Sequence, residues 1–199
     1  MKKIFTIILS FTSFLSFSQS RDKETIELSP VIGYSQSMVF IFTSEPVGGI
    51  NIGSNVDYYF NENWSLRSGL FYQTMGSKEV KFLIFSDEYS EKLKYLTIPL
   101  AINWHFGSNK NWNLNYGVSG GFLLDAKAKS EDGITIDTKD ISNSFQFGIN
   151  TGIGYKLTLT ENIGLVFDVS QFIGFTDTNK EKSRKNFYTS FNFGGVFKL

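Results

Sequence analysis

Large apolar residues alternate with smaller or polar ones along the stretch Tyr95–Phe106, which reads YLTIPLAINWHF. Because side chains on a strand point to opposite faces with a period of two, this alternation predicts a two-faced strand. The stretch is longer than the usual strand of about five or six residues. When tilted, it is long enough to cross a bilayer. Its candidate lipid-facing row is Leu96, Ile98, Leu100, Ile102 and Trp104.

The same alternation recurs along the chain and predicts eight strands. They are Glu24–Tyr34, Val47–Phe60, Trp64–Thr74, Tyr95–Phe106, Trp112–Leu124, Ser144–Leu157, Ile163–Phe175 and Asn186–Leu199. The connections between them alternate between long, charged segments and short turns. The long ones are Ser35–Glu45, Met75–Lys92, Asp125–Ile141 and Thr176–Lys185, and the short ones are Asn61–Asn63, Gly107–Asn111 and Thr158–Asn162. This alternation is typical of outer-membrane barrels, which have long outer loops and short periplasmic turns. We therefore predict an all-β, eight-stranded antiparallel transmembrane β-barrel, built as an up-and-down meander with both termini in the periplasm.

Three local features refine this prediction. The apolar runs Met38–Phe42 and Val80–Phe85 lie inside two of the long connections and are candidate strand extensions above the membrane. Pro99 lies in the middle of an expected strand and has no N–H to donate to a sheet. Because a closed barrel has no edge strand, we expect a bulge or a bound water at Pro99.

The face opposite the bulky residues consists mostly of Gly, Asn, Ser, Ala and Gln, and most charges fall in the expected connections. A charged side chain that faces lipid at the membrane midplane costs about 2–4 kcal/mol. We therefore predict that the bulky face meets lipid and that the small face lines a narrow interior. A soluble lipocalin-like barrel is the alternative, and it requires the bulky face inside. The charges expected within strands all fall on the small-residue face: Glu27, Asp57, Arg67, Lys156, Asp168 and Lys198.

Four of these inward charges, together with His105, are the candidate site. Asp57 and Arg67 flank one hairpin, and Lys156 and Asp168 flank another. Because an unpaired buried charge is very costly, we expect paired charges that neutralise a narrow lumen, with an ion pathway as the alternative. His105, the only histidine, is expected on the inner face near the periplasmic rim. We interpret it as a hydrogen-bonded interior residue, although a proton-sensitive gate or a catalytic base is also conceivable.

Aromatic residues make up 17% of the chain, with 21 phenylalanines, which raises the question of where the rings lie. Trp64, Trp104, Phe106 and Trp112 flank the short turns. Amphipathic rings settle at membrane–water interfaces, so these residues predict an aromatic belt at the periplasmic surface.

The N-terminus has the form of a secretory signal peptide. Lys2 and Lys3 precede an apolar segment, and Ser16–Ser18 supplies a small-x-small end. We expect a signal peptide over residues 1–18, with cleavage after Ser18 or at the latest after Ser20, and a barrel domain over residues 19–199. The chain contains no cysteine, which excludes disulfides, a zinc–thiolate site and a lipid anchor on cysteine.

The remaining composition argues against several chemistries. Lys and Arg together number 19, as do Asp and Glu, so no basic surface suggests nucleic-acid binding. No serine and aspartate spacing completes a catalytic triad with His105. Gly152-Ile153-Gly154 is not followed by a helix that could hold a phosphate. The acidic residues Asp132, Asp137 and Asp140 are more typical of a solvated loop than of a calcium site. We expect no enzymatic activity, no metal and no cofactor.

Three segments resemble small PorT-type outer-membrane β-barrel domain proteins. They are YLTIPLAINW (Tyr95–Trp104), NYGVSGGFLLDAKAK (Asn115–Lys129) and FQFGINTGIGYKL (Phe145–Leu157). The resemblance spans roughly the whole mature chain, although Gln146 stands where an acidic residue is common in that family. It implies an outer-membrane barrel from a family that is mostly without an assigned function, with one branch linked to secretion.

These observations lead to three functional hypotheses. The first is a non-enzymatic structural or interaction protein that displays outer loops and has a plugged lumen. The second is a small pore or a secretion or transport component, and the third is a membrane-embedded lipid-modifying enzyme. We expect a monomer in the cell outer membrane, exported through the cleaved signal peptide and assembled by the barrel-insertion machinery. Outer-membrane lipid is an expected partner, and an unknown protein partner would bind through the outer loops.

Overall fold

The computed structural model describes the chain except for residues 1–22, 40–43, 80–88 and 182. The expected signal peptide and the run Val80–Phe85 lie outside the described residues, as does most of Met38–Phe42. Within the described residues, no helix is long and apolar enough to cross a membrane.

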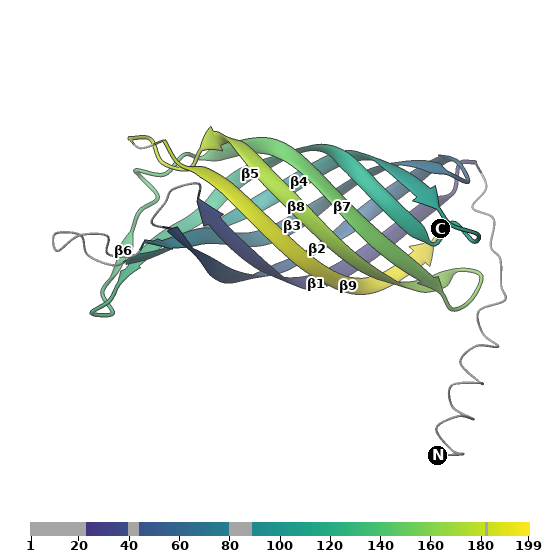
Figure 1. The fold of residues 1–199 in the computed structure, drawn as a ribbon, viewed down its shortest axis with the longest axis horizontal. Coiled ribbons are helices and arrows are strands. Elements are labelled where there is room, and N and C mark those ends of the chain that lie inside the picture. The colour runs from purple at the N-terminus through teal and green to yellow at the C-terminus, as the bar shows by residue number, and fades with distance from the viewer. Residues whose placement is uncertain (1–22, 40–43, 80–88, 182) are drawn as a thin grey trace, which may run out of the picture.

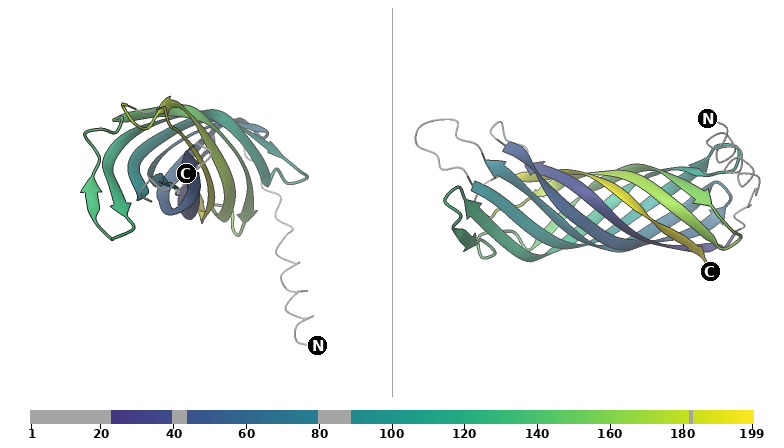
Figure 2. Two further views of the ribbon diagram at one scale, coloured as in Figure 1. Left: turned by 60° about the vertical axis from the view of Figure 1, so that its left-hand side comes forward. Right: turned by 90° about the horizontal axis from the view of Figure 1, so that it is seen from below.

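Eight long antiparallel strands close into a barrel (Figures 1 and 2). Sequence neighbours pair along the meander, β1 pairs with β9, and β4 pairs with β5, so that the circle closes. The short strand β6 adds only to the end of β5. The predicted eight-stranded antiparallel barrel is therefore confirmed. The strands are β1 Ile26–Val39, β2 Ser44–Asn61, β3 Trp64–Glu79, β4 Tyr89–Phe106, β5 Trp112–Ser130, β6 Thr135–Asp137, β7 Phe145–Thr158, β8 Ile163–Asp177 and β9 Lys185–Lys198.

The two ends of the barrel differ. One end holds the C-terminus and the short turns after β2, β4 and β7, and we call it the turn end (Figure 1). The β5–β6 hairpin projects from the opposite end, which we call the loop end (Figure 1). This is the arrangement that the alternating connections predict.

The strands run further toward the loop end than predicted. β1 continues to Val39, β4 begins at Tyr89 and β5 continues to Ser130, so much of the predicted long connections is strand. The expectation that charges lie almost only in connections is correspondingly wrong, because Lys92 and Lys127 belong to β4 and β5. On β4 and β5 the alternation was not recognisable there because lysines replace the outward apolar residues.

The lower part of the barrel, toward the turn end, has a polar inside and an apolar outside. Asp57 and His105 are fully buried, whereas Ile50 is 57% exposed and Tyr116 is 64% exposed. Large apolar side chains that cover the outer wall of a barrel require a lipid environment. The structure therefore overturns the lipocalin-like alternative, which needs the bulky face inside.

No bulge occurs at Pro99. β4 keeps one register with β5 there, and Pro99 lies opposite Ser119. On the other side, the pairing with β3 pauses between Ser68↔Leu100 and Phe71↔Thr97 and then resumes without a shift. Since proline has no N–H to offer β3, a gap in the ladder accommodates it without an inserted residue. The register shift between β4 and β5 instead lies next to Tyr95.

Candidate functional site

The centre of the candidate site is an ion pair between neighbouring strands. Asp57 on β2 lies directly opposite Arg67 on β3. Arg67 donates from Nε to Asp57 Oδ1 at 2.9 Å and from Nη2 to Oδ2 at 3.0 Å. Such two-point contacts hold a guanidinium and a carboxylate in a fixed relative orientation. Both side chains are buried, so the pair lies inside the barrel and away from bulk water.

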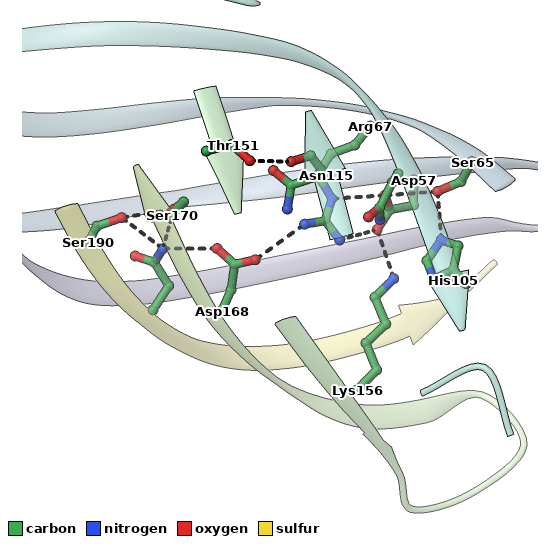
Figure 3. A network of polar contacts seen from close by, with 12 residues as sticks. Asp57, Ser65, Arg67, His105, Asn115, Thr151, Lys156, Asp168, Ser170 and Ser190 are labelled. Carbon is green, nitrogen blue, oxygen red and sulfur yellow. Dashed lines mark hydrogen bonds and ion pairs between the residues drawn. The ribbon is translucent and has the colours of Figure 1, made fainter. Parts of the chain in front are cut away.

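Lys156 crosses the lumen to join this pair (Figure 3). Its Nζ lies 2.8 Å from Asp57 Oδ2 and 2.6 Å from Glu27 Oε2, and it donates to the Tyr59 hydroxyl at 3.1 Å. The carboxylate partners of Lys156 therefore lie across the barrel, and not at Asp168 on the other strand of its own hairpin. β7 faces β1 and β2 across the barrel. The inward side chain of Lys156 on β7 therefore spans the lumen and reaches Glu27 on β1 and Asp57 on β2.

Asp168 joins the network from β8. Arg67 Nη1 lies 3.5 Å from Asp168 Oδ2, and Asn192 Nδ2 donates to Asp168 Oδ1 at 3.4 Å. Asn192 continues the network toward the loop end, because Asn51 Nδ2 donates to its Oδ1 at 2.7 Å. The charged layer thus passes into a layer of amides and hydroxyls.

His105 connects to the charged layer through Ser65. His105 Nε2 lies 2.9 Å from Ser65 Oγ, and this hydroxyl donates to Asp57 Oδ1 at 3.3 Å. The centroid of the His105 ring lies 4.7 Å from that of the Tyr59 ring. A hydroxyl has one proton, so a serine that donates to Asp57 must accept from His105. In a nucleophilic triad the histidine stands between the serine and the carboxylate. Here the serine is in the middle, and all three groups are buried, which does not support nucleophilic catalysis.

The structure brings all five predicted interior residues, Asp57, Arg67, His105, Lys156 and Asp168, into one network. Sequence reasoning left out two members, Glu27 and Tyr59. Glu27 was expected to face inward, but its contact with Lys156 depends on barrel closure, and no local pattern reports that closure. Tyr59 follows the alternation of β2 and is fully buried, so its position alone could have included it.

A polar cavity and an apolar cluster follow the charged layer inside the barrel, in the direction of the loop end. A polar cavity of about 50 Å³ lies among side chains that include Asn51, Gln73, Asn115 and Asn192. Such a space is large enough for a few water molecules. Above it, buried side chains that are mostly apolar pack into a cluster: Met75, Leu93, Tyr95, Leu123, Ala126, Phe172 and Tyr188.

The outer wall carries the predicted lipid-facing row. Ile98, Leu100, Ile102 and Trp104 are each more than 40% exposed, and Leu96 is half-buried. Next to the turn end, consecutive rings lie with their centroids 4.9–6.4 Å apart, in the series Trp64, Trp104, Phe106, Trp112 and Tyr155. The predicted aromatic belt therefore has the form of a continuous row of rings.

Asp137 and Asp140 lie exposed in and after the β5–β6 hairpin, and Asp132 lies exposed within it. Within the part of the chain that the structure describes, no group of three His, Cys, Asp or Glu residues is placed to hold a metal ion.

Residues 14–180 match the family described as outer membrane protein beta-barrel domain, and the chain belongs to this family. No curated protein matches the sequence. This family is broader than the PorT-type proteins, and the match does not identify the PorT-type branch within it. Together with the closed barrel, the family places the protein in the outer membrane.

Solved outer-membrane barrels share the fold. OprG from Pseudomonas aeruginosa has a TM-score of 0.52 at 12% identity, with 89% of this chain and 97% of OprG covered. AlkL has a TM-score of 0.51 at 11% identity, with 92% of this chain and 94% of AlkL covered. The attachment invasion locus protein Ail of Yersinia pestis has a TM-score of 0.47 at 18% identity, with 86% and 99% covered. At these identities, the similarity to OprG and AlkL shows a common fold alone and carries no information about activity.

Proposed function

We propose that this outer-membrane barrel is a non-enzymatic structural or interaction protein, which presents its loop end to the outside and does not conduct through its lumen. One observation carries the proposal, namely that the interior is filled at two separate levels. The charged layer around Asp57 occupies the lower bore, and the apolar cluster around Phe172 occupies the upper bore. An eight-stranded barrel leaves little space that its own side chains do not fill.

The function is then located at the loop end. In this class of barrel the long loops face outward and the short turns face the periplasm. The β5–β6 hairpin extends the wall beyond the bore, and Ile134 and Ile136 on it are 62% and 60% exposed. Exposed apolar side chains on an outer hairpin support contact with a protein partner.

Planar-bilayer recording tests this proposal. We expect the purified wild-type protein to give no stable channels. The triple variant Arg67→Ala/Lys156→Ala/Phe172→Ala removes large side chains from both filled levels and serves as the conducting control. Stable channels from the wild-type protein would contradict the plugged lumen and favour the second candidate function, a small pore or a transport component. The polar cavity that Asp168 helps to line is the observation that favours that second candidate.

We also infer that residues 1–18 are a cleaved signal peptide and that the chain belongs to the PorT-type branch. The basic start, apolar segment and small-residue end of residues 1–18 support the former, and the three segments around Tyr95, Asn115 and Phe145 support the latter. The intact mass of the protein purified from membranes tests the cleavage. A mature chain that starts at Gln19, or at Arg21 for the later site, is expected, and an uncleaved Met1 would contradict it.

A further inference from the structure

Lysines line the outward face of β4 and β5 where these strands extend beyond the bore. Lys92 and Lys94 belong to β4, and Lys127 and Lys129 belong to β5. Lys92 pairs directly with Lys127 in the register, and both are exposed. We call Lys92, Lys94, Lys127 and Lys129 the basic strip.

The basic strip stands directly above the lipid-facing wall. On β4, the next outward residue below Lys94 is Leu96. On β5, the outward residues below Asp125 are Leu124 and Phe122, which are 43% and 54% exposed. The change from apolar to charged side chains on one face marks the level at which the hydrocarbon ends. The strip therefore lies at the height of the lipid headgroups.

The charges of the strip are only partly balanced. Asp125 lies 2.9 Å from Lys94 Nζ and 3.6 Å from Lys127 Nζ, and the hydrogen bond from Lys94 holds the pKa of Asp125 below its usual value. Asp137 lies opposite Lys127 in the register with β6. For Lys92 and Lys129, the described residues supply no ion-pair partner. Like charges directly opposite each other in a sheet are unfavourable, so the pair Lys92–Lys127 favours a bound anion.

Other parts of the rim lack this excess. On the β8–β9 side, Asp177 lies opposite Lys185, while Lys180 Nζ is held by the backbone carbonyl of Asp140 in a loop and not on the wall. On the β2–β3 side, Glu45 lies 4.0 Å from Lys78. Among the residues that the structure describes, lysines on one outward face of the wall are thus concentrated over the β4–β5 sector.

We infer that the basic strip binds the phosphate groups of lipids in the outer leaflet. Ammonium groups donate to phosphate oxygens, and each lysine near a membrane surface contributes about 1 kcal/mol of attraction to anionic lipid, a factor of roughly five in binding. The apolar side chains of Leu96, Phe122 and Leu124 continue the site downward and contact the acyl chains. This continuity with the lipid-facing wall selects a phosphorylated lipid over a soluble anion.

Lipid retention in nanodiscs tests the inference. The full mature protein is placed in phosphatidylcholine discs that contain phosphorylated lipid A, released from the discs and analysed by native mass spectrometry. We expect bound lipid A on the wild type and a loss of roughly fivefold for each lysine removed in Lys92→Gln/Lys127→Gln. The control Lys180→Gln/Lys185→Gln removes the same charge from the same end of the barrel and should retain lipid as the wild type does.

Equal retention by both double variants would overturn the inference. So would displacement of lipid A by inorganic phosphate at matched concentration, because it would indicate a site for free anions. Electrophoresis with and without boiling verifies that each variant is folded. The inference is independent of the plugged lumen, because conductance and lipid retention are separate measurements.

Discussion

The two parts of β4 reverse the polarity of their faces. From Leu96 to Phe106 the outward side chains are apolar and the inward ones, such as Asn103 and His105, are polar and buried. From Tyr89 to Tyr95 the outward side chains include Lys92 and Lys94, while the buried face carries Leu93 and Tyr95 together with one carboxylate, Glu91. One continuous strand thus serves as a membrane wall in one part and as the wall of an ordinary apolar core in the other.

The medium outside the wall explains the reversal. Lipid makes an outward charge costly, so the membrane part places its charges inside and pairs them. Water removes that cost, so on β4 the loop-end part places its lysines outside and buries Leu93 and Tyr95, with Glu91 as the one charged residue on the buried face. β5 reverses at the same level, since Phe122 and Leu124 face outward below Lys127, and Ala126 is buried. The change from lysine to leucine on the outward face indicates that the outer surface of the membrane lies between Lys94 and Leu96.

The largest effect is expected in the membrane part, at the buried charges. Asp57→Ala leaves Arg67 and Lys156 without their shared carboxylate. Removing one partner of a buried ion pair costs about 3–5 kcal/mol, and we expect a loss of this size in the free energy of unfolding. Urea titration of the protein in lipid vesicles measures it. A loss below about 1 kcal/mol, the size expected for a surface ion pair, would show that water reaches the charged layer.

The apolar core of the loop-end part comes next. Leu93→Ala removes a fully buried side chain from the cluster of Met75, Tyr95 and Phe172. Large-to-small changes at such positions cost about 2–5 kcal/mol. The same urea titration measures the loss, and Lys92→Ala, the outward neighbour on β4, is the control. Equal losses in both variants would mean that the loop-end part has no core of its own.

An outward charge should distinguish the two parts of β4 directly. Leu100→Arg places a cation on the lipid-facing wall, and we expect a loss of about 2–4 kcal/mol. Ser90→Arg makes the same change on the same face of the loop-end part and should stay within about 0.5 kcal/mol of the wild type. A comparable loss in both variants would contradict the boundary at Leu96.

The smallest effect is expected for the exposed pair of Lys94 and Asp125. The hydrogen bond from Lys94 lowers the pKa of Asp125, so the folded protein protonates Asp125 at a lower pH than the unfolded chain does. The resulting stabilisation is present above the ordinary pKa of an aspartate and disappears as the pH falls through the lowered value. The stability difference between wild type and Asp125→Asn should therefore be slight at neutral pH and absent in strong acid. A difference that grows in acid would contradict this assignment.

The sequence was informative wherever one medium holds along the strand. Between Leu96 and Phe106, the alternation predicted the strand, its faces and the belt residue Trp104. It was not informative for Tyr89–Lys94, because there lysines replace the outward apolar residues, and lysines in a strand resemble those of a charged loop. It predicted that Asp57, Arg67, Lys156 and Asp168 face inward. It could not predict that Lys156 meets Glu27, because that contact depends on which strands face each other across the closed barrel.

A cysteine scan along the outward face of β4 tests the reversal most directly. The chain has no cysteine, so single cysteines at positions 90, 92, 94, 96, 98 and 100 can each carry a spin label. In lipid vesicles, we predict that labels at Leu96, Ile98 and Leu100 collide with oxygen dissolved in the lipid. Labels at Ser90 and Lys92 should instead collide with a water-soluble nickel complex, with the change between Lys94 and Leu96. Lipid contact that continues through Lys92, or water contact that reaches Leu100, would contradict the account.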